Sequence, residues 1–203
     1  MKKTVVFALC IVFTLLCLAG CTNNIHDIDD FDDLFEIKSY PEGYPTKEDI
    51  VEAYKKTSEA FGWITMTSQP KLDMDKKADI DGVPYYKVDS KYLRDLDALE
   101  DYYETLMDEE TTDILMEVNE EIHRFVERKD GLYCTDFSYV PKGFSEDTAY
   151  IVKKVSDTSY TLDVSYQLID EEDKSQKKDR VQTYRYEKID GEWIFVNFRL
   201  FRQ

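Results

Sequence analysis

The sequence predicts an α+β fold in which N-terminal helices pack on one face of a curved antiparallel β-sheet. Three observations lead to this class. Apolar residues recur at helical spacing through the first half of residues 46–203, they alternate with polar residues through the second half, and turn signals separate the alternating runs. Because neither an internal repeat nor a second break in composition is present, we expect residues 46–203 to form a single domain.

Three helices are predicted in the first part of the domain. They cover residues 47–62, 93–107 and 114–122. The segment Thr46-Lys47-Glu48-Asp49 has the pattern of a capping box, which begins the first helix. Thr111 or Thr112 is expected to cap the third helix, because a threonine hydroxyl can accept a hydrogen bond from a free N–H of the first turn.

Strands are predicted in most of the remaining sequence. They cover residues 83–88, 123–127, 132–137, 149–155, 160–169, 181–189 and 193–201. Asp81-Gly82, Asp130-Gly131 and Asp190-Gly191 are turn signals next to these strands. The strand at 160–169 alternates, so we expect it to have one buried face and one solvated face. The last strand is apolar on both faces, so we expect it to be central in the sheet or covered on both sides.

The first 21 residues carry the pattern of a bacterial lipoprotein signal. Two lysines precede an apolar run, Val5 to Leu18, which as a helix spans about 21 Å and falls short of a hydrocarbon core of about 30 Å. Leu18-Ala19-Gly20-Cys21 resembles a lipobox, which implies lipid attachment to Cys21 and removal of residues 1–20. We therefore expect a protein anchored to the cell membrane by lipid and facing outside the cytoplasm. An ordinary secretory signal is the alternative.

Residues 21–45 form an acidic segment between the signal and the domain. Seven acidic residues and a single lysine occur in it, so repulsion between like charges favours an extended tether. Ile28, Phe31, Leu34 and Phe35 have helical spacing, however. A short helix docked on the domain is therefore the alternative to a free tether.

The charge of the chain limits its partners. The 203 residues contain 26 Lys and Arg against 43 Asp and Glu, for a net charge of -17, and removal of residues 1–20 takes away two lysines and no acid. Affinity for nucleic acid comes from Lys and Arg that replace counterions, so this composition argues against nucleic-acid binding. A basic protein is the partner that the charge favours.

Catalytic, cofactor and metal sites are not predicted. His26 and His123 do not have metal-ligand spacing, and the sequence has neither a Cys-x-x-Cys pair nor a glycine-rich phosphate loop. Cys134 and His123 could face each other from adjacent strands as nucleophile and base, but a buried cysteine is the simpler interpretation. We therefore predict a protein that is not an enzyme and that uses no cofactor.

Two predicted connections between strands are the candidate contact surfaces. Residues 138–148 contain aromatic side chains without a periodicity that would bury them, and residues 170–179 are charged, with acids before lysines. Loops on a rigid sheet commonly bind partners, although a solvated hairpin is the alternative for the second loop. The candidate contact residues are Tyr139, Lys142, Phe144, Glu146 and Asp147 in the first loop and Glu171, Glu172 and Asp173 in the second.

Several motifs resemble those of IseA-type DL-endopeptidase inhibitors of Gram-positive bacteria. The motifs are Ala60-Phe61-Gly62-Trp63, Asp81 to Val88, the helix from Leu96 to Tyr103, Asp130-Gly131-Leu132-Tyr133 and Asp190 to Phe198. They follow one another in this order over residues 47–203, behind the lipobox. The resemblance implies an inhibitor that blocks the active-site cleft of a cell-wall endopeptidase with an NlpC/P60 domain, using its body and a mobile loop. Such hydrolases are often basic, which agrees with the acidic charge of the chain.

Two other functions stay open. A terminal Gly-x-Trp strand also occurs in cystatin-like and NTF2-like sheets, and an NTF2-like protein would bind a small ligand between its helices and its sheet. A large enclosed pocket with titratable groups would favour that alternative, whereas a collapsed aromatic core would oppose it. A lipoprotein that acts in envelope assembly is the other alternative.

Overall fold

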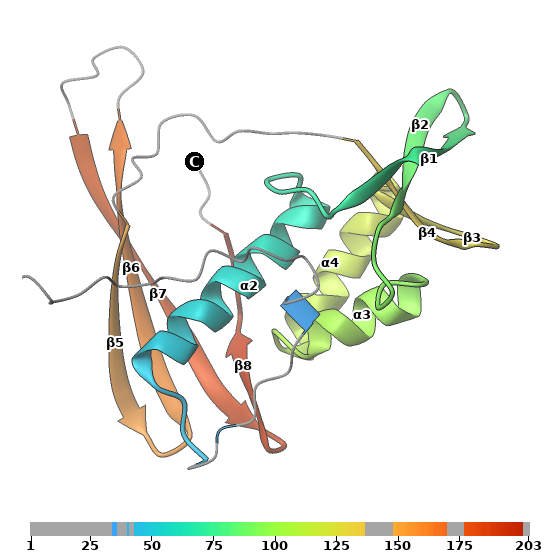
Figure 1. The fold of residues 1–203 in the computed structure, drawn as a ribbon. Helices are drawn as coiled ribbons and strands as arrows, with labels where there is room; N and C mark the ends of the chain where they lie inside the picture. The colour runs from blue at the N-terminus through green and yellow to red at the C-terminus, as the bar shows by residue number, and fades with distance from the viewer. Residues whose placement is uncertain (1–33, 36–39, 41–42, 137–147, 170–176, 201–203) are drawn as a thin grey trace, which may run out of the picture.

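The computed structural model describes residues 34–35, 40, 43–136, 148–169 and 177–200 (Figure 1). Its helices are α2 (Lys47–Thr65), α3 (Leu96–Glu104) and α4 (Glu109–Ile122). Its strands are β1 (Leu72–Ile80), β2 (Val83–Val88), β3 (Phe125–Arg128), β4 (Gly131–Thr135), β5 (Ala149–Ser156), β6 (Ser159–Ile169), β7 (Lys177–Ile189) and β8 (Glu192–Val196). The predicted α+β class is confirmed, and the strands divide into two antiparallel four-stranded sheets.

Helix α2 runs across the C-terminal sheet towards the N-terminal sheet (Figure 1). Its predicted capping box is confirmed, because Thr46 Oγ1 accepts a hydrogen bond from the Asp49 N–H (3.2 Å) and Asp49 Oδ2 accepts one from the Thr46 N–H (2.8 Å). The helix ends where Met66 adopts a left-handed conformation, with φ of 59°. It therefore continues a little beyond the end predicted at residue 62.

The N-terminal sheet has the strand order β1-β2-β4-β3 and contains one strand that the sequence pattern did not predict. Strand β1 lies at the edge of the sheet, and its pairing with β2 shifts register between Asp73 and Lys77. Much of β1 is exposed, so it lacks the apolar alternation that marks a half-buried strand. The turn after it explains its pairing: Asp81 and Gly82 both have positive φ (52° and 82°), as a tight two-residue hairpin requires.

The C-terminal sheet has the order β5-β6-β7-β8, so the last strand lies at an edge. Of the two expectations for this strand, the central position is wrong and the covered position is confirmed, because Trp193, Ile194 and Phe195 are all buried. The segment before α4 covers the edge of β8: the Phe195 N–H donates to the Leu106 carbonyl (3.0 Å), and the Asp108 N–H donates to the Phe195 carbonyl (3.0 Å). Strand β8 is therefore not open to solvent along its outer edge, because the segment before α4 pairs with that edge.

Helix α4 starts earlier than predicted. Asp108 is its N-cap residue, and both Thr111 and Thr112 are buried within the first turn, so the predicted threonine cap is wrong. Several residues that can cap a helix follow one another here, and an apolar pattern does not choose among them. His123 ends the helix in a left-handed conformation (φ of 51°), so the next strand starts at Phe125 and not at His123.

Aromatic rings fill the interface between α2 and the C-terminal sheet. Tyr54 of α2 lies 4.8 Å from Tyr184 of β7, and Phe61 of α2 lies 5.4 Å from Phe198, as measured between ring centroids. Phe195 of β8 packs 5.5 Å from Phe198 and belongs to the same cluster. These pairs place the core between the helix and the inner face of the sheet.

Candidate functional surfaces

The strand register places both candidate loops at one end of the C-terminal sheet. Strand β5 starts opposite Ser165, near the end of β6, and the last residue of β6 pairs with the first residue of β7. The connection 137–147 therefore reaches the sheet at the same end at which residues 170–176 join β6 to β7 (Figure 1). We call this end of the C-terminal sheet the loop end.

The predicted lipid-attachment residue, Cys21, and the predicted contact residues lie outside the described residues. The contact residues are Tyr139, Lys142, Phe144, Glu146, Asp147, Glu171, Glu172 and Asp173. The structure places the strand ends that flank them: the first loop connects β4 of the N-terminal sheet to β5 of the C-terminal sheet, and the second connects neighbouring strands of one hairpin. Two loops that are separate in the sequence are thus brought to a common end.

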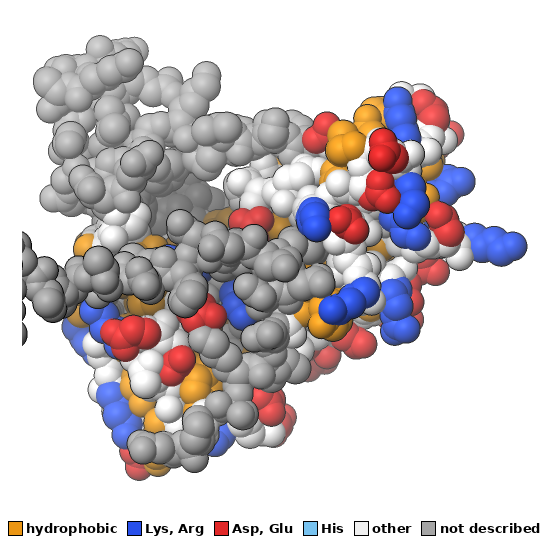
Figure 2. Space-filling view, in the orientation of Figure 1, with side chains coloured by type: hydrophobic (Ala, Val, Ile, Leu, Met, Phe, Trp, Pro, Cys, Tyr) orange, Lys and Arg blue, Asp and Glu red, His pale blue; other side chains and the backbone are white. Residues whose placement is uncertain are grey.

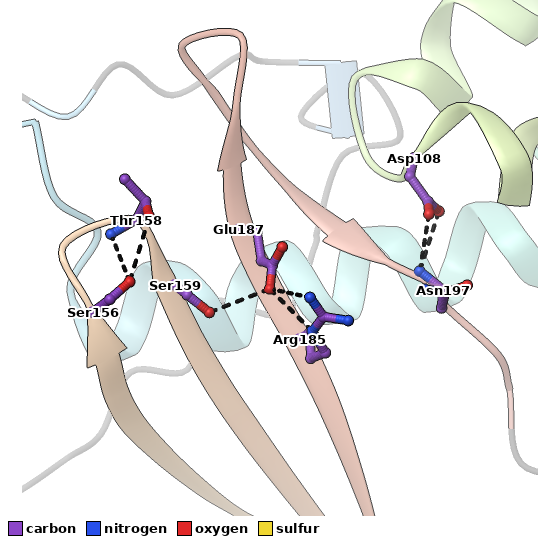
Figure 3. A network of polar contacts seen from close by, with 7 residues as sticks. All are labelled: Asp108, Ser156, Thr158, Ser159, Arg185, Glu187 and Asn197. Carbon is purple, nitrogen blue, oxygen red and sulfur yellow. Dashed lines mark hydrogen bonds and ion pairs between the residues drawn. The ribbon is translucent and has the colours of Figure 1, made fainter.

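The outer face of the C-terminal sheet carries paired polar side chains (Figure 3). Glu187 Oε1 accepts hydrogen bonds from Arg185 Nη2 (2.6 Å) and from Ser159 Oγ (3.4 Å). Lys153 Nζ on β5 lies 2.7 Å from Asp163 Oδ2 on β6. Because these charges pair with each other on a face in contact with water, they fit the solvated face that the alternation of β6 predicts.

Arg124 is a buried cation that links three segments of the core. Its side chain donates hydrogen bonds from Nε to the Trp63 carbonyl (3.0 Å), from Nη2 to Gln69 Oε1 (2.7 Å), and from Nη1 to the carbonyl and hydroxyl oxygens of Thr135. Burial lowers the pKa of this guanidinium. The sequence did not reveal this role, because a single arginine between a helix and a strand has the pattern of an exposed residue.

Cys134 and His123 do not have the properties of a catalytic pair. Cys134 is buried in β4, and its thiol donates to the Thr135 carbonyl (3.4 Å). Burial raises the pKa of the Cys134 thiol to about 12, so the thiol stays protonated at neutral pH. His123 is exposed at the end of α4. These environments favour the interpretation of Cys134 as a small buried apolar residue.

No protein-family model matches the chain, and a search of the curated proteins finds no relative. Within the part of the chain that the structure describes, no three His, Cys, Asp or Glu side chains gather where they could hold a metal ion. Among the same residues, no helix is both long enough and apolar enough to cross a bilayer. The candidate functions therefore depend on the residues and on their geometry.

Described residues ahead of α2 pack against the domain. Leu34 is buried, and its carbonyl accepts a hydrogen bond from the Tyr102 hydroxyl (3.0 Å). The ring of Phe35 lies 4.5 Å from that of Tyr102 and 4.9 Å from that of Tyr92. Of the two interpretations of residues 21–45, these contacts support docking for Leu34 and Phe35.

A cavity of about 300 Å³ lies between these residues, α2 and the turn that joins β7 to β8. The Tyr40 and Tyr186 hydroxyls in its wall are 3.3 Å apart, and Lys56 Nζ lies 3.8 Å from Glu52 Oε1. Sites for small ligands typically enclose about 300–1,000 Å³, so this cavity is at the lower limit. It is not the large pocket between helices and sheet that the NTF2-like alternative requires.

The sequence pattern did not single out a long acidic run that lies on α3 and α4. Residues 95–123 contain twelve acidic residues and neither Lys nor Arg, a run that is visible in the sequence. None of these acids forms an ion pair with a described residue. Desolvation, followed by the negative charges of Glu104 and Asp113, raises the pKa of Glu100. The two helices therefore present an uncompensated negative surface.

Proposed function

We propose that the protein is a membrane-anchored extracytoplasmic lipoprotein that inhibits cell-wall DL-endopeptidases of the NlpC/P60 type. In this proposal, lipid on Cys21 holds the protein at the membrane, and the loop end of the C-terminal sheet blocks the active-site cleft of the enzyme. The observation that carries the proposal is the strand register that brings both candidate loops to one end of the sheet. The protein acts by binding and not by catalysis.

The scaffold beneath the loop end is suited to this role. Strands β6 and β7 pair along the whole length of β6, and the aromatic cluster fixes their inner face against α2. Loops that bind a cleft need such a scaffold, because a rigid support lowers the entropy lost when the complex forms.

The filled interface between α2 and the C-terminal sheet favours this proposal over a small-ligand site. Tyr54, Tyr184 and Phe198 occupy the space in which an NTF2-like protein would hold its ligand. The cavity beside Tyr40 and Tyr186 favours the small-ligand alternative, but its volume of about 300 Å³ is at the lower limit for such sites. A ligand of this kind would have to be small.

Inhibition of a purified NlpC/P60 endopeptidase tests the proposal. We expect the soluble chain of residues 22–203 to inhibit with saturation at an equimolar ratio, because one cleft holds one loop end. Tyr139→Ala combined with Phe144→Ala tests the first loop, and Glu171→Ala combined with Glu172→Ala tests the second. At least one of the two pairs should weaken inhibition by about tenfold or more, since buried aromatic anchors and close charge pairs dominate such interfaces.

Asp157→Ala is the matched control, because Asp157 lies in the β5–β6 turn at the opposite end of the same sheet. This variant should inhibit like the unaltered chain. Absence of inhibition at micromolar excess would contradict the proposed function. Inhibition that neither pair of loop substitutions changes would contradict the assignment of the loop end.

Lipid labelling tests the anchor separately. Cells that express the full chain and are grown with labelled palmitate should incorporate the label into the protein, and the protein should sediment with the membranes. Cys21→Ala should abolish both properties, because the thiol is the proposed attachment site. A full chain that stays unlabelled would favour an ordinary secretory signal.

A further inference from the structure

Helix α4 carries a row of exposed apolar side chains. Ile114 and Ile122 are 54% and 43% exposed, and Val118 between them is partly exposed. Residues at i, i+4 and i+8 lie on one side of a helix, and this row extends over about 12 Å along the axis. The adjacent side of α4, which includes Leu115 and Asn119, is buried in the domain, and Val118 packs partly against the core. We call the row of Ile114, Val118 and Ile122 the α4 stripe.

Acidic side chains lie beside the α4 stripe and continue onto α3. Glu117 and Glu121 are three and seven residues after Ile114, which places both on the same exposed side of the helix. Helix α3 packs against α4, and the negative charge of Asp113 on α4 is among the causes that raise the pKa of Glu100 on α3, so acids of the two helices are neighbours. The acidic helical face is defined as the α4 stripe together with Asp97, Glu100, Asp101, Glu104, Glu110, Asp113, Glu117 and Glu121.

The surface of the N-terminal sheet is different. Lys71 Nζ lies 3.1 Å from Asp89 Oδ2, and Lys76 Nζ lies 3.0 Å from Asp73 Oδ2. Figure 2 shows basic and acidic side chains intermixed over this sheet. Positive charge is thus available within the chain, but none of it pairs with the described acids of α3 and α4. Among the residues that the structure describes, the acidic helical face thus has no balancing positive charge, and a basic partner would complement it.

We propose that the acidic helical face binds a basic amphipathic helix of a partner protein. The apolar side of that helix would cover the α4 stripe, and its Lys and Arg side chains would lie over Glu117 and Glu121. A short apolar row flanked by charge matches the way one helix presents anchors at i, i+3, i+4 and i+7 to another. Nucleic acid and anionic membranes carry the wrong sign of charge for this face.

This surface is separate from the loop end, which lies at the far side of the C-terminal sheet (Figure 1). The inference therefore goes beyond the proposed function, and it does not require the partner to be an endopeptidase. Loss of inhibition after changes in the loops and loss of helix binding after changes in α4 are independent results.

Binding of a synthetic helical peptide tests the inference. The probe is a labelled peptide of about 18 residues, or five turns, with leucines on one side and lysines on the other. A second peptide with Ala in place of Leu has the same charge without the apolar side. Fluorescence anisotropy is measured with the chain of residues 22–203, which retains every described element. We expect the leucine peptide to bind at least about tenfold more tightly than the alanine peptide.

Two pairs of substitutions in α4 separate charge from apolar contact. Glu117→Lys with Glu121→Lys should weaken binding by about tenfold and reduce its dependence on salt, because the electrostatic attraction is reversed locally. Ile114→Ser with Ile122→Ser should weaken binding by a similar factor of about ten at any salt concentration. All four positions are exposed, so circular dichroism should show that each variant keeps its fold.

Matched controls place the same changes elsewhere. Asp75→Lys with Glu127→Lys makes the same change in net charge on the N-terminal sheet, and Met74→Ser with Val155→Ser removes two other exposed apolar side chains. Both controls should bind the leucine peptide like the unaltered chain. Equal loss of binding in the charge control would show that net charge alone is responsible, and it would overturn the inference. Self-association of the unaltered chain that Ile114→Ser with Ile122→Ser abolishes would also overturn it, because the occupant of the face would be a second copy.

Discussion

Helix α2 is held in the molecule by two different kinds of interaction. On the side of the C-terminal sheet, Tyr54 and Phe61 pack against aromatic rings, so the attraction scales with buried apolar area and tolerates small shifts of a ring. At the C-terminal end of α2, the guanidinium of Arg124 donates to the Trp63 carbonyl, one of the carbonyls that a helix end leaves without an intrahelical partner. That contact depends on direction. Substitutions at the two ends of α2 should therefore act through lost area in one case and through lost donors in the other.

The largest effect is expected at Phe195, which is 1% exposed and lies among the rings of the aromatic interface. Phe195→Ala should lower the free energy of unfolding by about 4 kcal/mol, because it removes apolar area and leaves a cavity. Urea unfolding followed by tryptophan fluorescence measures this loss. Phe195→Leu keeps most of the area and should cost less than half as much. Equal losses for both variants would show that shape, and not area, determines stability on this side of α2.

Arg124→Met tests the hydrogen bonds that hold the C-terminal end of α2. Methionine keeps much of the volume but donates no hydrogen bond, so the carbonyl of Trp63 and the side chain of Gln69 lose their donors. Buried acceptors without donors should lower the free energy of unfolding by about 3 kcal/mol. Arg124→Lys restores the charge without the planar arrangement of donors, so it should rescue only part of the loss. If the Met variant were as stable as the unaltered chain, the Arg124 side chain would contribute only by filling space and not by its hydrogen bonds.

The same contrast explains how much of the fold the sequence could predict. Apolar periodicity located α2 and the alternating strand β6, because burial is encoded locally there. The Asp-Gly pairs located the turns at Asp81-Gly82 and Asp190-Gly191, because the positive φ angles of these turns are also encoded locally. The periodicity did not predict β1, because most residues of β1 are exposed. Pairing with β2, and not burial of apolar side chains, holds β1 in the sheet. The periodicity could not decide between a central and a covered position for β8, because the segment that pairs with its edge is distant in the sequence.

The candidate surfaces divide in a similar way. Loop composition predicted connections at 138–148 and 170–179, but residues 177–179 belong to β7. That the flanking strand ends lie at a common end of the sheet appears only in the strand register. The run of acids on α3 and α4 was visible in the sequence, whereas the exposure of Ile114 and Ile122 depends on which side of α4 the core occupies. Arg124 gave no local signal, because its acceptors come from α2, from the loop after it and from β4.

Asp108 provides a smaller test, because it joins the start of α4 directly to the end of strand β8. Its carboxylate accepts a hydrogen bond from the Asn197 backbone N–H, whose nitrogen lies 3.2 Å from each oxygen (Figure 3). It accepts another from the Thr111 hydroxyl. Asp108→Ala should lower the free energy of unfolding by about 1 kcal/mol, through loss of these bonds and of a negative charge at the N-terminus of α4. Glu109→Ala removes a neighbouring exposed charge and is the control. If Asp108→Ala lowered the free energy of unfolding as much as Arg124→Met does, Asp108 would be the principal link between α4 and the C-terminal sheet.

The smallest expected effect is the pH dependence of stability that Glu59, near the C-terminal end of α2, produces. Glu59 Oε1 accepts a hydrogen bond from Trp63 Nε1 (3.3 Å), and burial raises the pKa of this carboxyl. The folded protein therefore keeps the Glu59 proton at pH values at which the unfolded chain, with an ordinary pKa of about 4.3, has released it. Its contribution to stability is fully present below the unfolded pKa and is lost as pH rises through the folded pKa.

Glu59→Gln keeps the acceptor for Trp63 and removes the titration. The variant should gain stability relative to the unaltered chain between about pH 4 and about pH 7, and urea unfolding at both pH values measures the gain. Glu127→Gln, at an exposed position of strand β3, controls for the loss of one negative charge from an acidic chain. A gain for Glu59→Gln that does not change with pH, or that Glu127→Gln reproduces, would mean that general repulsion and not burial determines the effect. A gain confined to Glu59 would show that α2 sacrifices stability at neutral pH to keep its polar end hydrogen-bonded.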